Sequence, residues 1–318
     1  MRKILLTKKL NQKNAALFDG IADIDLVTVA DGDQAAFDTH IKDAEAVLLS
    51  TAYKMSADVI AGAQNLKVIS RTGVGVDNVD VAAATERGIL VLNTPQANSI
   101  SVAEHTVALI VAISKQLLMY DSELRAGNFK VRRSGKTTDI EGKTLGLIGC
   151  GRIGRFAAEK CKAAFGMDII GYDPYIESLD GITLFKDIED VFKKADYISL
   201  HIPLTSETKG LVGEKMLSLM KPTAFLINTA RGGIIDEHAL ADKLRNDEIA
   251  GAALDVLESE PPQADNPLLG LKNVILTPHS AALTKECSAR VAFEATRGIS
   301  DYLKGDQPEF VFNKELIK

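Results

Sequence analysis

The first hundred residues alternate short apolar runs with segments of helical periodicity. The periodic segments lie near residues 11–19, 33–41, 56–63 and 80–87. Short apolar runs between helical patterns indicate buried parallel strands, because crossover helices cover both faces of such a sheet. This part of the chain therefore predicts a β-α-β-α series. The predicted strands are Ile4–Leu6, Leu26–Val29, Ala46–Leu49, Lys67–Ile69 and Ile89–Leu92.

A long helix is predicted next, from about Ser101 to Ala126. Ser101 and Glu104 have the spacing of a capping box at its start. The segment is apolar on nearly every side as far as Leu118, which is typical of a helix buried between domains or in a subunit interface. Its most apolar run, 107–113, is far shorter than the roughly 20 residues that span a bilayer.

A second series of strands and helices follows, with a helix predicted directly after the first strand, from Ile153 to about Ala164. An amphipathic helix is predicted at about 284–303. The chain has 318 residues, a length that suggests about two domains. The pattern as a whole predicts an α/β protein with parallel sheets. The strands of this series are predicted at Thr144–Ile148, Ile169–Tyr172, Tyr197–Leu200, Ala224–Asn228, Ala252–Asp255 and Val274–Leu276.

Composition and charge narrow the functional classes. The net charge of −6 argues against a nucleic-acid backbone as partner. The chain has no polybasic run, which argues against binding to a membrane surface. The three cysteines are widely spaced, and the N-terminus lacks the long apolar segment of a signal peptide, so a cytoplasmic protein is expected. The five histidines show no metal-ligand spacing, so no metal site is predicted.

The segment LGLIGCGRIG carries a nucleotide-binding pattern, Gly149-x-Gly151-x-x-Gly154, between a predicted strand and a predicted helix. Gly149 would permit the tight turn, and Gly151 would let the backbone approach a pyrophosphate. The N–H groups of Arg152 and Ile153, at the start of the helix, would hold its charge.

Asp173 completes this pattern, because it lies 19 residues after Gly154 at the end of the next predicted strand. Its carboxylate would accept hydrogen bonds from ribose hydroxyls and repel a 2′-phosphate, which predicts NAD rather than NADP. The alternative is an ordinary strand–helix turn with an incidental aspartate.

Four further polar residues lie at or after the ends of predicted strands, namely Arg231, Asp255, Glu260 and His279. An arginine fork can bind a carboxylate and polarise the adjacent carbonyl. A histidine oriented by a carboxylate can give a proton to that carbonyl oxygen, and Asp255 could contact a nicotinamide. Each residue also has an explanation without function. His279 could be an ordinary loop residue, and Arg231 could cap a helix or pair on the surface. Asp255 could be a helix N-cap and Glu260 a solvated loop residue.

The sequence resembles the D-isomer-specific 2-hydroxyacid dehydrogenases, and most of all their phosphoglycerate dehydrogenase branch. The matching segments extend over most of the chain in the family's order. They are RTGVGVDNVD (71–80), NTPQANSISVAEHT (93–106), GKTLGLIGCGRIG (142–154), HIPLTSETKGLV (201–212), NTARGGIIDE (228–237), GAALDVLESEPP (251–262) and TPHSAALTKE (277–286).

This resemblance implies that Arg231, Glu260 and His279 are catalytic and that Asp255 contacts the nicotinamide. It implies that Val74 and Gly75 present backbone N–H groups to the substrate carboxylate. The remaining cofactor contacts implied are Ile202, Pro203 and Thr208 near the adenine and phosphates, Thr229 and Ala230 beside the nicotinamide, and Val74, Arg231, His279 and Ala281.

The fold implied is two doubly wound parallel-sheet, Rossmann-like domains with a cleft between them. The substrate domain would comprise residues 1–98 and 284–318, and the NAD-binding domain residues 99–283. A homodimer formed through the NAD-binding domain would account for the apolar helix from Ser101.

One departure from the family pattern concerns the substrate. Phosphoglycerate dehydrogenases usually carry an arginine after the third strand, where this chain has Ser50. A substrate phosphate needs a cationic partner, and Lys54, Arg132 or Arg133 could replace that arginine. Because the chain ends at Lys318, feedback by serine through a further domain is not expected.

The sequence thus predicts an NAD-dependent enzyme that interconverts a small D-2-hydroxy acid and its 2-keto acid. Phosphoglycerate, glycerate with hydroxypyruvate, and a broader range of 2-keto acids remain open as substrates. A different class, a non-enzymatic regulator that senses NAD, also remains open.

Overall fold

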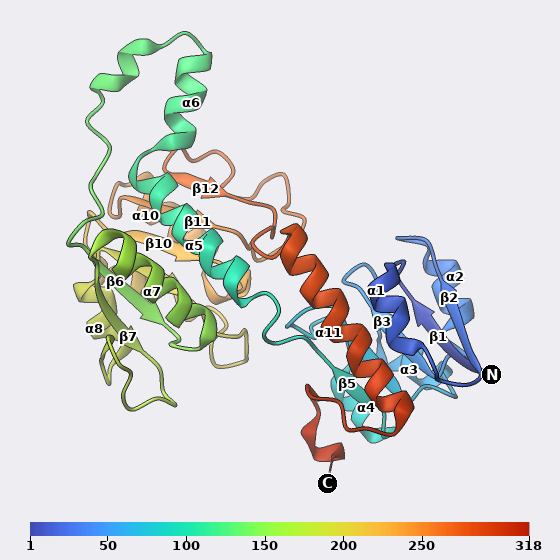
Figure 1. Ribbon diagram of the computed structural model, residues 1–318. Coiled ribbons are helices and arrows are strands. Elements are labelled where there is room, and N and C mark those ends of the chain that lie inside the picture. The colour runs from blue at the N-terminus through green and yellow to red at the C-terminus, as the bar shows by residue number, and fades with distance from the viewer. Residues whose placement is uncertain (318) are drawn as a thin grey trace. The chain divides into compact units, whose positions relative to one another are not determined.

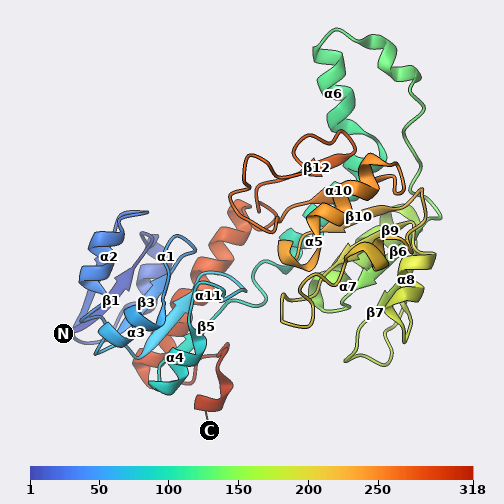
Figure 2. The same cartoon turned by 180° about the vertical axis from the view of Figure 1, so that it is seen from behind.

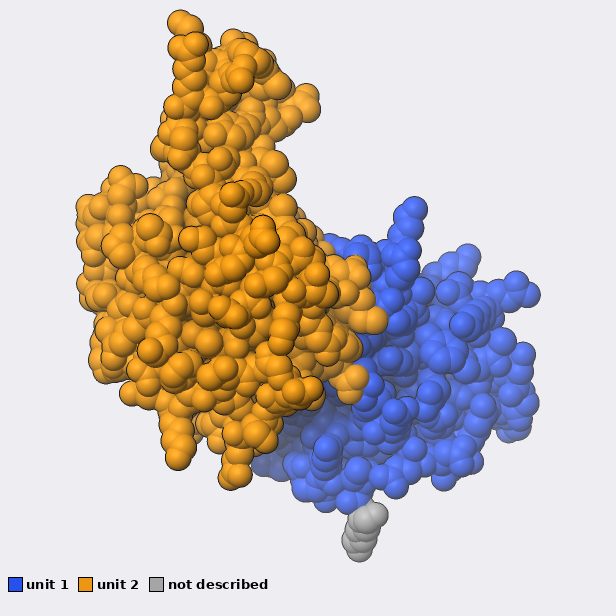
Figure 3. Space-filling model, turned by 60° about the vertical axis from the view of Figure 1, so that its left-hand side comes forward, with its two compact units in different colours: residues 1–98, 283–318 blue, residues 99–282 orange. Residues whose placement is uncertain are grey.

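The computed structural model describes residues 1–317, which form two compact units (Figure 1, Figure 3). Unit 1 takes both chain ends, Met1–Asn98 and Leu283–Lys318, and unit 2 is the middle of the chain, Ser99–Ala282. The last position of the predicted segment 284–318 lies outside the described residues.

Unit 1 is built on a five-stranded parallel sheet in the order β2-β1-β3-β4-β5. The long helix α11 packs against β3 and β4, so the C-terminal segment covers a face of the sheet that the N-terminal segment forms (Figure 2). The strands are β1 (Arg2–Leu6), β2 (Ile24–Thr28), β3 (Ala46–Leu49), β4 (Val68–Arg71) and β5 (Leu90–Leu92). The helices are α1 (Gln12–Ala15), η1 (Ala16–Phe18), α2 (Gln34–His40), α3 (Ala57–Gly62), α4 (Val81–Glu86), α11 (Lys285–Lys304) and η4 (Lys314–Leu316).

Unit 2 is built on a seven-stranded parallel sheet in the order β12-β11-β10-β9-β6-β7-β8. Buried side chains fill both faces of this sheet, as a parallel sheet between helices requires. The strands are β6 (Thr144–Ile148), β7 (Asp168–Tyr172), β8 (Thr183–Leu184), β9 (Tyr197–Leu200), β10 (Phe225–Asn228), β11 (Gly251–Leu254) and β12 (Val274–Leu276). The helices are α5 (Ser99–Ser114), α6 (Leu117–Arg125), η2 (Phe129–Arg133), α7 (Arg152–Phe165), α8 (Ile188–Lys194), α9 (Glu214–Leu217), η3 (Gly232–Ile234) and α10 (Glu237–Arg245).

The predicted α/β fold with two parallel sheets is confirmed, and the predicted strands agree with the observed ones to within two residues at each end. The edge strand β8, Thr183–Leu184, was not predicted. Its two residues are too few to show an apolar pattern in the sequence.

The single helix predicted over 101–126 is wrong, because the chain forms α5 and α6 with a bend of 57° between them. Gln116 adopts a left-handed conformation (φ 51°, ψ 38°), which ends the first helix. The predicted capping box is also wrong: α5 begins at Ser99, so Ser101 lies buried inside its first turn.

The two helices differ in burial. Nine of the 16 residues of α5 are buried, whereas none of α6 is. The second helix and η2 form an arm that projects from the sheet of unit 2 (Figure 1). Within residues 1–317 no single helix is long and apolar enough to cross a membrane, and only the bent pair α5–α6 reaches that length and apolarity when taken together.

Candidate active site

Six strands of unit 2 end level with one another, which brings the loops after them to one edge of the sheet. Ile148 lies opposite Tyr172 and Leu200, and Asn228 lies opposite Leu200 and Leu254. The sheet order reverses between β6 and β9, and parallel sheets bind ligands at such a point. The predicted residues at this edge are Gly149, Gly151, Arg152, Ile153, Gly154, Asp173, Ile202, Pro203, Thr208, Thr229, Ala230, Arg231, Asp255, Glu260, His279 and Ala281.

The glycine turn after β6 has two glycines that the protein itself requires. Gly149 has φ +93°, and a Cβ there would lie 2.7 Å from the carbonyl oxygen of His201. A Cβ at Gly154 would lie 2.5 Å from the carbonyl oxygen of Gly149. These contacts let α7 start directly against the turn.

Gly151 differs, because a Cβ at this position would meet no protein atom within 4 Å. It is the N-cap of the 14-residue helix α7, whose first N–H groups, including those of Arg152 and Ile153, have no partners within the helix. Open space beside unpaired N–H groups fits a phosphate group. The turn is therefore compatible with the pyrophosphate of a dinucleotide.

Asp173 fixes the glycine turn to the end of β7. Its Oδ2 accepts a hydrogen bond from the Cys150 N–H (2.9 Å) and its Oδ1 accepts one from the Tyr175 N–H (3.0 Å). Each oxygen keeps a lone pair for a further donor such as a ribose hydroxyl. Burial, and secondarily the charge of Asp173, raise the pKa of the neighbouring Cys150 thiol to about 12, so this thiol stays protonated.

The loop after β9 is shaped by a threonine. The Thr208 hydroxyl donates to the Pro203 carbonyl (2.6 Å) and accepts from the Thr205 N–H (2.8 Å). Ile202, which begins this loop, is half-buried and lies against the glycine turn at Gly149.

Arg231 projects from a turn that Asn228 braces from within the sheet. The buried Asn228 side chain accepts from the Ala230 N–H and donates to the Arg231 carbonyl, both at 2.9 Å. Thr229 lies in the same turn, and its hydroxyl contacts that of Thr106 on α5 (3.0 Å). No role was predicted for Asn228 or Thr106, although both lie in the segments that resemble the family.

Asp255 is buried, with a side chain that is 1% exposed, and it organises the loop after β12. Its carboxylate accepts from Thr277 Oγ1, from the Ser280 N–H (2.8 Å) and from the Ala281 N–H (2.9 Å). His105 Nε2 lies 3.5 Å from Oδ1. Burial by itself would raise the pKa of Asp255, but these hydrogen bonds together lower it, which keeps the carboxylate charged. The role of His105 was not predicted.

His279 and Glu260 form a hydrogen-bonded pair, with His279 Nδ1 2.7 Å from Glu260 Oε2. Glu260 Oε1 also accepts from the Leu257 N–H (3.1 Å), which fixes the carboxylate. Both side chains are partly exposed, at 49% and 39%. Among residues 1–317, Nε2 of His279 has no hydrogen-bond partner in the protein, so it is available to a ligand.

The backbone of His279 is strained, with φ +51° in a residue that is not glycine. Two hydrogen bonds from its N–H, to the carbonyls of Asp255 (2.7 Å) and Thr277 (3.0 Å), hold this conformation. Strain of this kind persists where the surrounding structure enforces it, and it is concentrated at functional sites.

The predicted substrate residues Ser50, Lys54, Val74 and Gly75 lie in unit 1. Ser50 follows β3, and its N–H donates to the Thr7 hydroxyl (2.8 Å). Val74 follows β4, and its carbonyl accepts from the Asn93 side chain (2.8 Å). Lys54 is exposed, as are Arg132 and Arg133 in η2 of unit 2.

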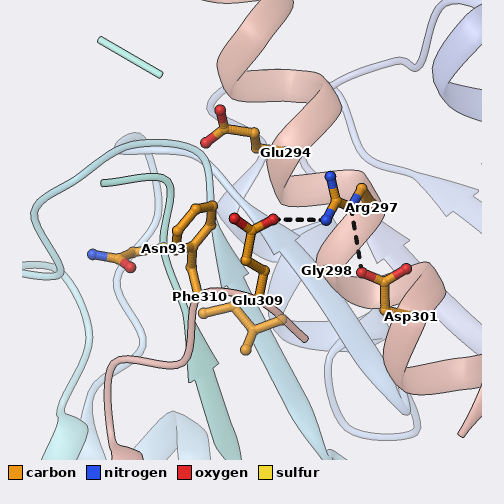
Figure 4. A pocket seen from close by; sticks show the side chains of 8 residues that line it. Asn93, Glu294, Arg297, Gly298, Asp301, Glu309 and Phe310 are labelled. Atoms are coloured by element: carbon orange, nitrogen blue, oxygen red, sulfur yellow. Dashed lines mark hydrogen bonds and ion pairs between the residues drawn. The ribbon is translucent and has the colours of Figure 1, made fainter. Parts of the chain in front are cut away.

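Unit 1 also contains a small pocket, and none of these predicted substrate residues lines it (Figure 4). Its volume of about 20 Å³ holds about one water molecule. The Arg297 guanidinium donates to Glu309 (2.6 Å) and lies 3.5 Å from Asp301, so the charges are paired within the pocket (Figure 4). It is too small for a keto acid.

Comparison with known proteins gives relatives of several specificities. The chain is 44% identical, over its whole length, to a D-3-phosphoglycerate dehydrogenase of Methanocaldococcus jannaschii, and it spans only 60% of that relative's length. It is 41% identical to a glyoxylate reductase of Thermofilum pendens, covering 88% of this chain and 84% of that one. Among solved structures, a D-lactate dehydrogenase from Aquifex aeolicus complexed with NAD and lactic acid has 28% identity and a TM-score of 0.82, covering 99% and 97% of the two chains.

The family comparison identifies the central part of the chain. Residues 107–281 match the family described as D-isomer specific 2-hydroxyacid dehydrogenase, NAD binding domain. This range contains the glycine turn, Asp173, Arg231, Asp255 and the His279–Glu260 pair. The predicted resemblance is confirmed, and the chain belongs to the D-isomer specific 2-hydroxyacid dehydrogenases, whose NAD-binding domain it carries.

Proposed function

We propose that the protein is an enzyme that interconverts a small D-2-hydroxy acid and its 2-keto acid with NAD(H). The observation that carries the proposal is the His279–Glu260 hydrogen bond of 2.7 Å at the sheet edge that also bears the glycine turn. The pair leaves one ring nitrogen of His279 oriented and the other available, which is the arrangement that acid–base catalysis requires.

Each side chain at this edge has a role in the proposal. Bound NADH supplies a hydride to the keto carbon. Arg231 binds the substrate carboxylate through its guanidinium fork and polarises the carbonyl. His279 donates a proton from Nε2 to the carbonyl oxygen, while Glu260 holds Nδ1 and so orients the ring. In the opposite direction His279 accepts the hydroxyl proton.

The remaining residues bind and orient. The N–H groups after Gly151 hold the pyrophosphate, Asp173 binds the adenosine ribose, and Ile202, Pro203 and Thr208 surround the adenine and phosphates. Asp255, Thr229, Ala230 and Ala281 lie on the nicotinamide side. On the resemblance alone, Val74 and Gly75 contact the substrate carboxylate.

The substrate favoured is the D-3-phosphoglycerate and phosphohydroxypyruvate pair, which places the enzyme in serine biosynthesis. The 44% identical relative bears that name, and Lys54, Arg132 and Arg133 are exposed cations available to a phosphate. A second candidate is reduction of glyoxylate or hydroxypyruvate. Ser50 in place of the family arginine favours it, as does the 41% identical glyoxylate reductase.

The deciding experiment is NADH oxidation by the purified protein with phosphohydroxypyruvate, hydroxypyruvate and glyoxylate in parallel. A strong preference for the phosphorylated acid supports the first candidate, and a preference for the plain acids supports the second. Tight NADH binding without turnover of any 2-keto acid would instead establish a regulator. His279→Ala serves as the control, since it should remove most of the turnover and leave NADH binding intact.

The quaternary structure proposed is a homodimer formed through unit 2. The arm of α6 and η2 exposes apolar side chains that a partner would cover: Leu117 is 50% exposed, Leu118 53%, Leu124 57% and Phe129 63%. The proposed location is the cytoplasm, supported by three cysteines that are all free and buried.

A further inference from the structure

The loop that carries Glu260 is attached to the protein by one buried side chain. Residues 258–265 are mostly exposed, with Ser259 half-buried. At one end of the loop the Glu258 N–H donates to Glu237 Oε1, and at the other end the Asn266 amide donates to Glu237 Oε2, both at 2.6 Å. Glu237 is the first residue of α10 and is 5% exposed. A single carboxylate therefore holds both ends of the Glu260 loop.

The Glu260 loop also contacts the turn that carries Arg231. A methyl group on Gly232, the residue after Arg231, would overlap the carbonyl of Leu257 and the N–H of Glu258. The Arg231 turn and the Glu260 loop thus touch backbone to backbone, a few atoms from the bond that Glu237 accepts. A shift of this loop would move Glu260 relative to both Arg231 and His279.

We propose that Glu237 is a positioning residue for the acid–base pair, holding Glu260 where it orients the His279 imidazole. This inference rests on the proposed function. Neither oxygen of Glu237 needs to touch substrate or cofactor, because the carboxylate acts through the loop. The geometry is specific to a carboxylate, since both partners of Glu237 are donors and both of its oxygens must accept.

Glu237→Gln breaks this arrangement with almost no change of shape. The glutamine oxygen can still accept from the Glu258 N–H, but its NH₂ group then faces the NH₂ group of Asn266. Asn266 cannot turn its amide around, because its Oδ1 already accepts from the Leu268 N–H (2.9 Å). Adding Asn266→Asp supplies two acceptors at that position, so the double variant restores a complete set of hydrogen bonds.

A shorter acid separates position from charge. Glu237→Asp keeps the negative charge but is one methylene too short to reach both partners. If Glu237 acted only through its charge, this variant would behave like the wild type. Asp242→Asn, which removes an acid on the same helix that pairs with Arg245, is the control for loss of charge alone.

The test combines kinetics with amide hydrogen exchange. Glu237→Gln and Glu237→Asp should lower kcat/KM for keto-acid reduction about tenfold and alter its pH profile. Exchange in peptides over 257–266 should become faster in both. The double variant should regain the wild-type profile and protection, and Asp242→Asn should not differ from wild type.

The outcomes that overturn the proposal are distinct. Wild-type pH profiles and loop protection in both single variants would refute it, as would a double variant no better than Glu237→Gln. If Glu237→Gln does not fold, Asn266→Ala, which removes one anchor only, makes the same comparison. Absence of turnover in the wild-type protein would instead count against the proposed function, while the exchange data would still decide whether Glu237 holds the loop.

Discussion

At the scale of single residues, the site combines side chains held by hydrogen bonds with a strained backbone at His279. His279 has a positive φ although it has a Cβ, and its ring is oriented by Glu260. A left-handed conformation costs a residue with a Cβ about 1 kcal/mol or more relative to glycine. The protein therefore keeps a histidine where its backbone would favour glycine, which is consistent with the proposed proton transfer.

A pair of substitutions tests this strain. His279→Gly and His279→Ala should both lose most of the turnover. Because glycine accepts φ +51° and alanine does not, the glycine variant should be more stable than the alanine variant by about 1 kcal/mol. This reverses the usual order of the two residues. Urea unfolding of both variants measures it, and an alanine variant that is the more stable would contradict the strain.

His201 at the end of β9 gives a pH dependence of stability. Burial lowers its pKa from 6.5 to about 4, so the folded protein stays neutral here while the unfolded chain takes up a proton as the pH falls below 6.5. Protonation then favours the unfolded chain. This contribution to stability is complete above pH 6.5 and declines toward pH 4, with a slope that approaches about 1.4 kcal/mol per pH unit.

Unfolding by urea at pH 7, 6 and 5 should show this decline, together with the contributions of other groups. His201→Gln removes the titrating ring and keeps a polar partner for Ser199, whose hydroxyl lies 3.0 Å from His201 Nε2. The variant should lose stability less steeply between pH 6 and pH 5 than the wild type. Equal slopes would show that His201 titrates alike in both states.

At the scale of elements, α7 shows two different uses of glycine within four residues. Gly154 is needed for packing, since a Cβ would lie 2.5 Å from the Gly149 carbonyl oxygen, whereas Gly151 meets no protein atom within 4 Å. A bound phosphate would account for the absence of a side chain at Gly151.

Alanine at each position separates the two explanations. Gly154→Ala should reduce the free energy of unfolding by about 1–3 kcal/mol, because the turn must move. Gly151→Ala should reduce stability by no more than about 1 kcal/mol, since alanine is a poorer N-cap than glycine, and weaken NADH binding about tenfold or more. Thermal unfolding and NADH fluorescence titration measure both quantities in each variant. Normal NADH affinity in Gly151→Ala would remove the turn as a pyrophosphate site.

At the scale of the whole molecule, the exposed arm of unit 2 carries the proposed dimer interface. Leu117→Glu combined with Leu124→Glu should shift the proposed dimer to a monomer, because charges would replace apolar side chains that a partner would cover. Light scattering coupled to size-exclusion chromatography gives the mass. Leu269→Glu, a 47% exposed leucine of the same unit, should leave it unchanged. If the wild-type protein is monomeric, the proposed interface is wrong.

Much of the fold follows from the sequence because its strands are short apolar runs between helical patterns. A strand such as Ala46–Leu49, which is buried over its whole length, can be predicted without knowing which strands lie beside it. The division of the segment 101–126 into two helices could not be predicted in this way. Apolar residues resume at Leu117 directly after Lys115 and Gln116, and two polar residues do not reveal that the backbone reverses at Gln116.

The candidate site also has a part that the sequence predicts and a part that it does not. The glycine turn, Asp173, Arg231, Glu260 and His279 could be predicted from the sequence, because they lie after predicted strands in segments that resemble the family, and their roles stay predictions. The contacts that support these residues appear in the tertiary structure alone: Asn228 under the arginine turn, His105 beside Asp255, and Glu237 at both ends of the Glu260 loop. The reason is physical, since a buried hydrogen bond joins residues that are distant in sequence, and no local pattern records which donor a buried acceptor meets.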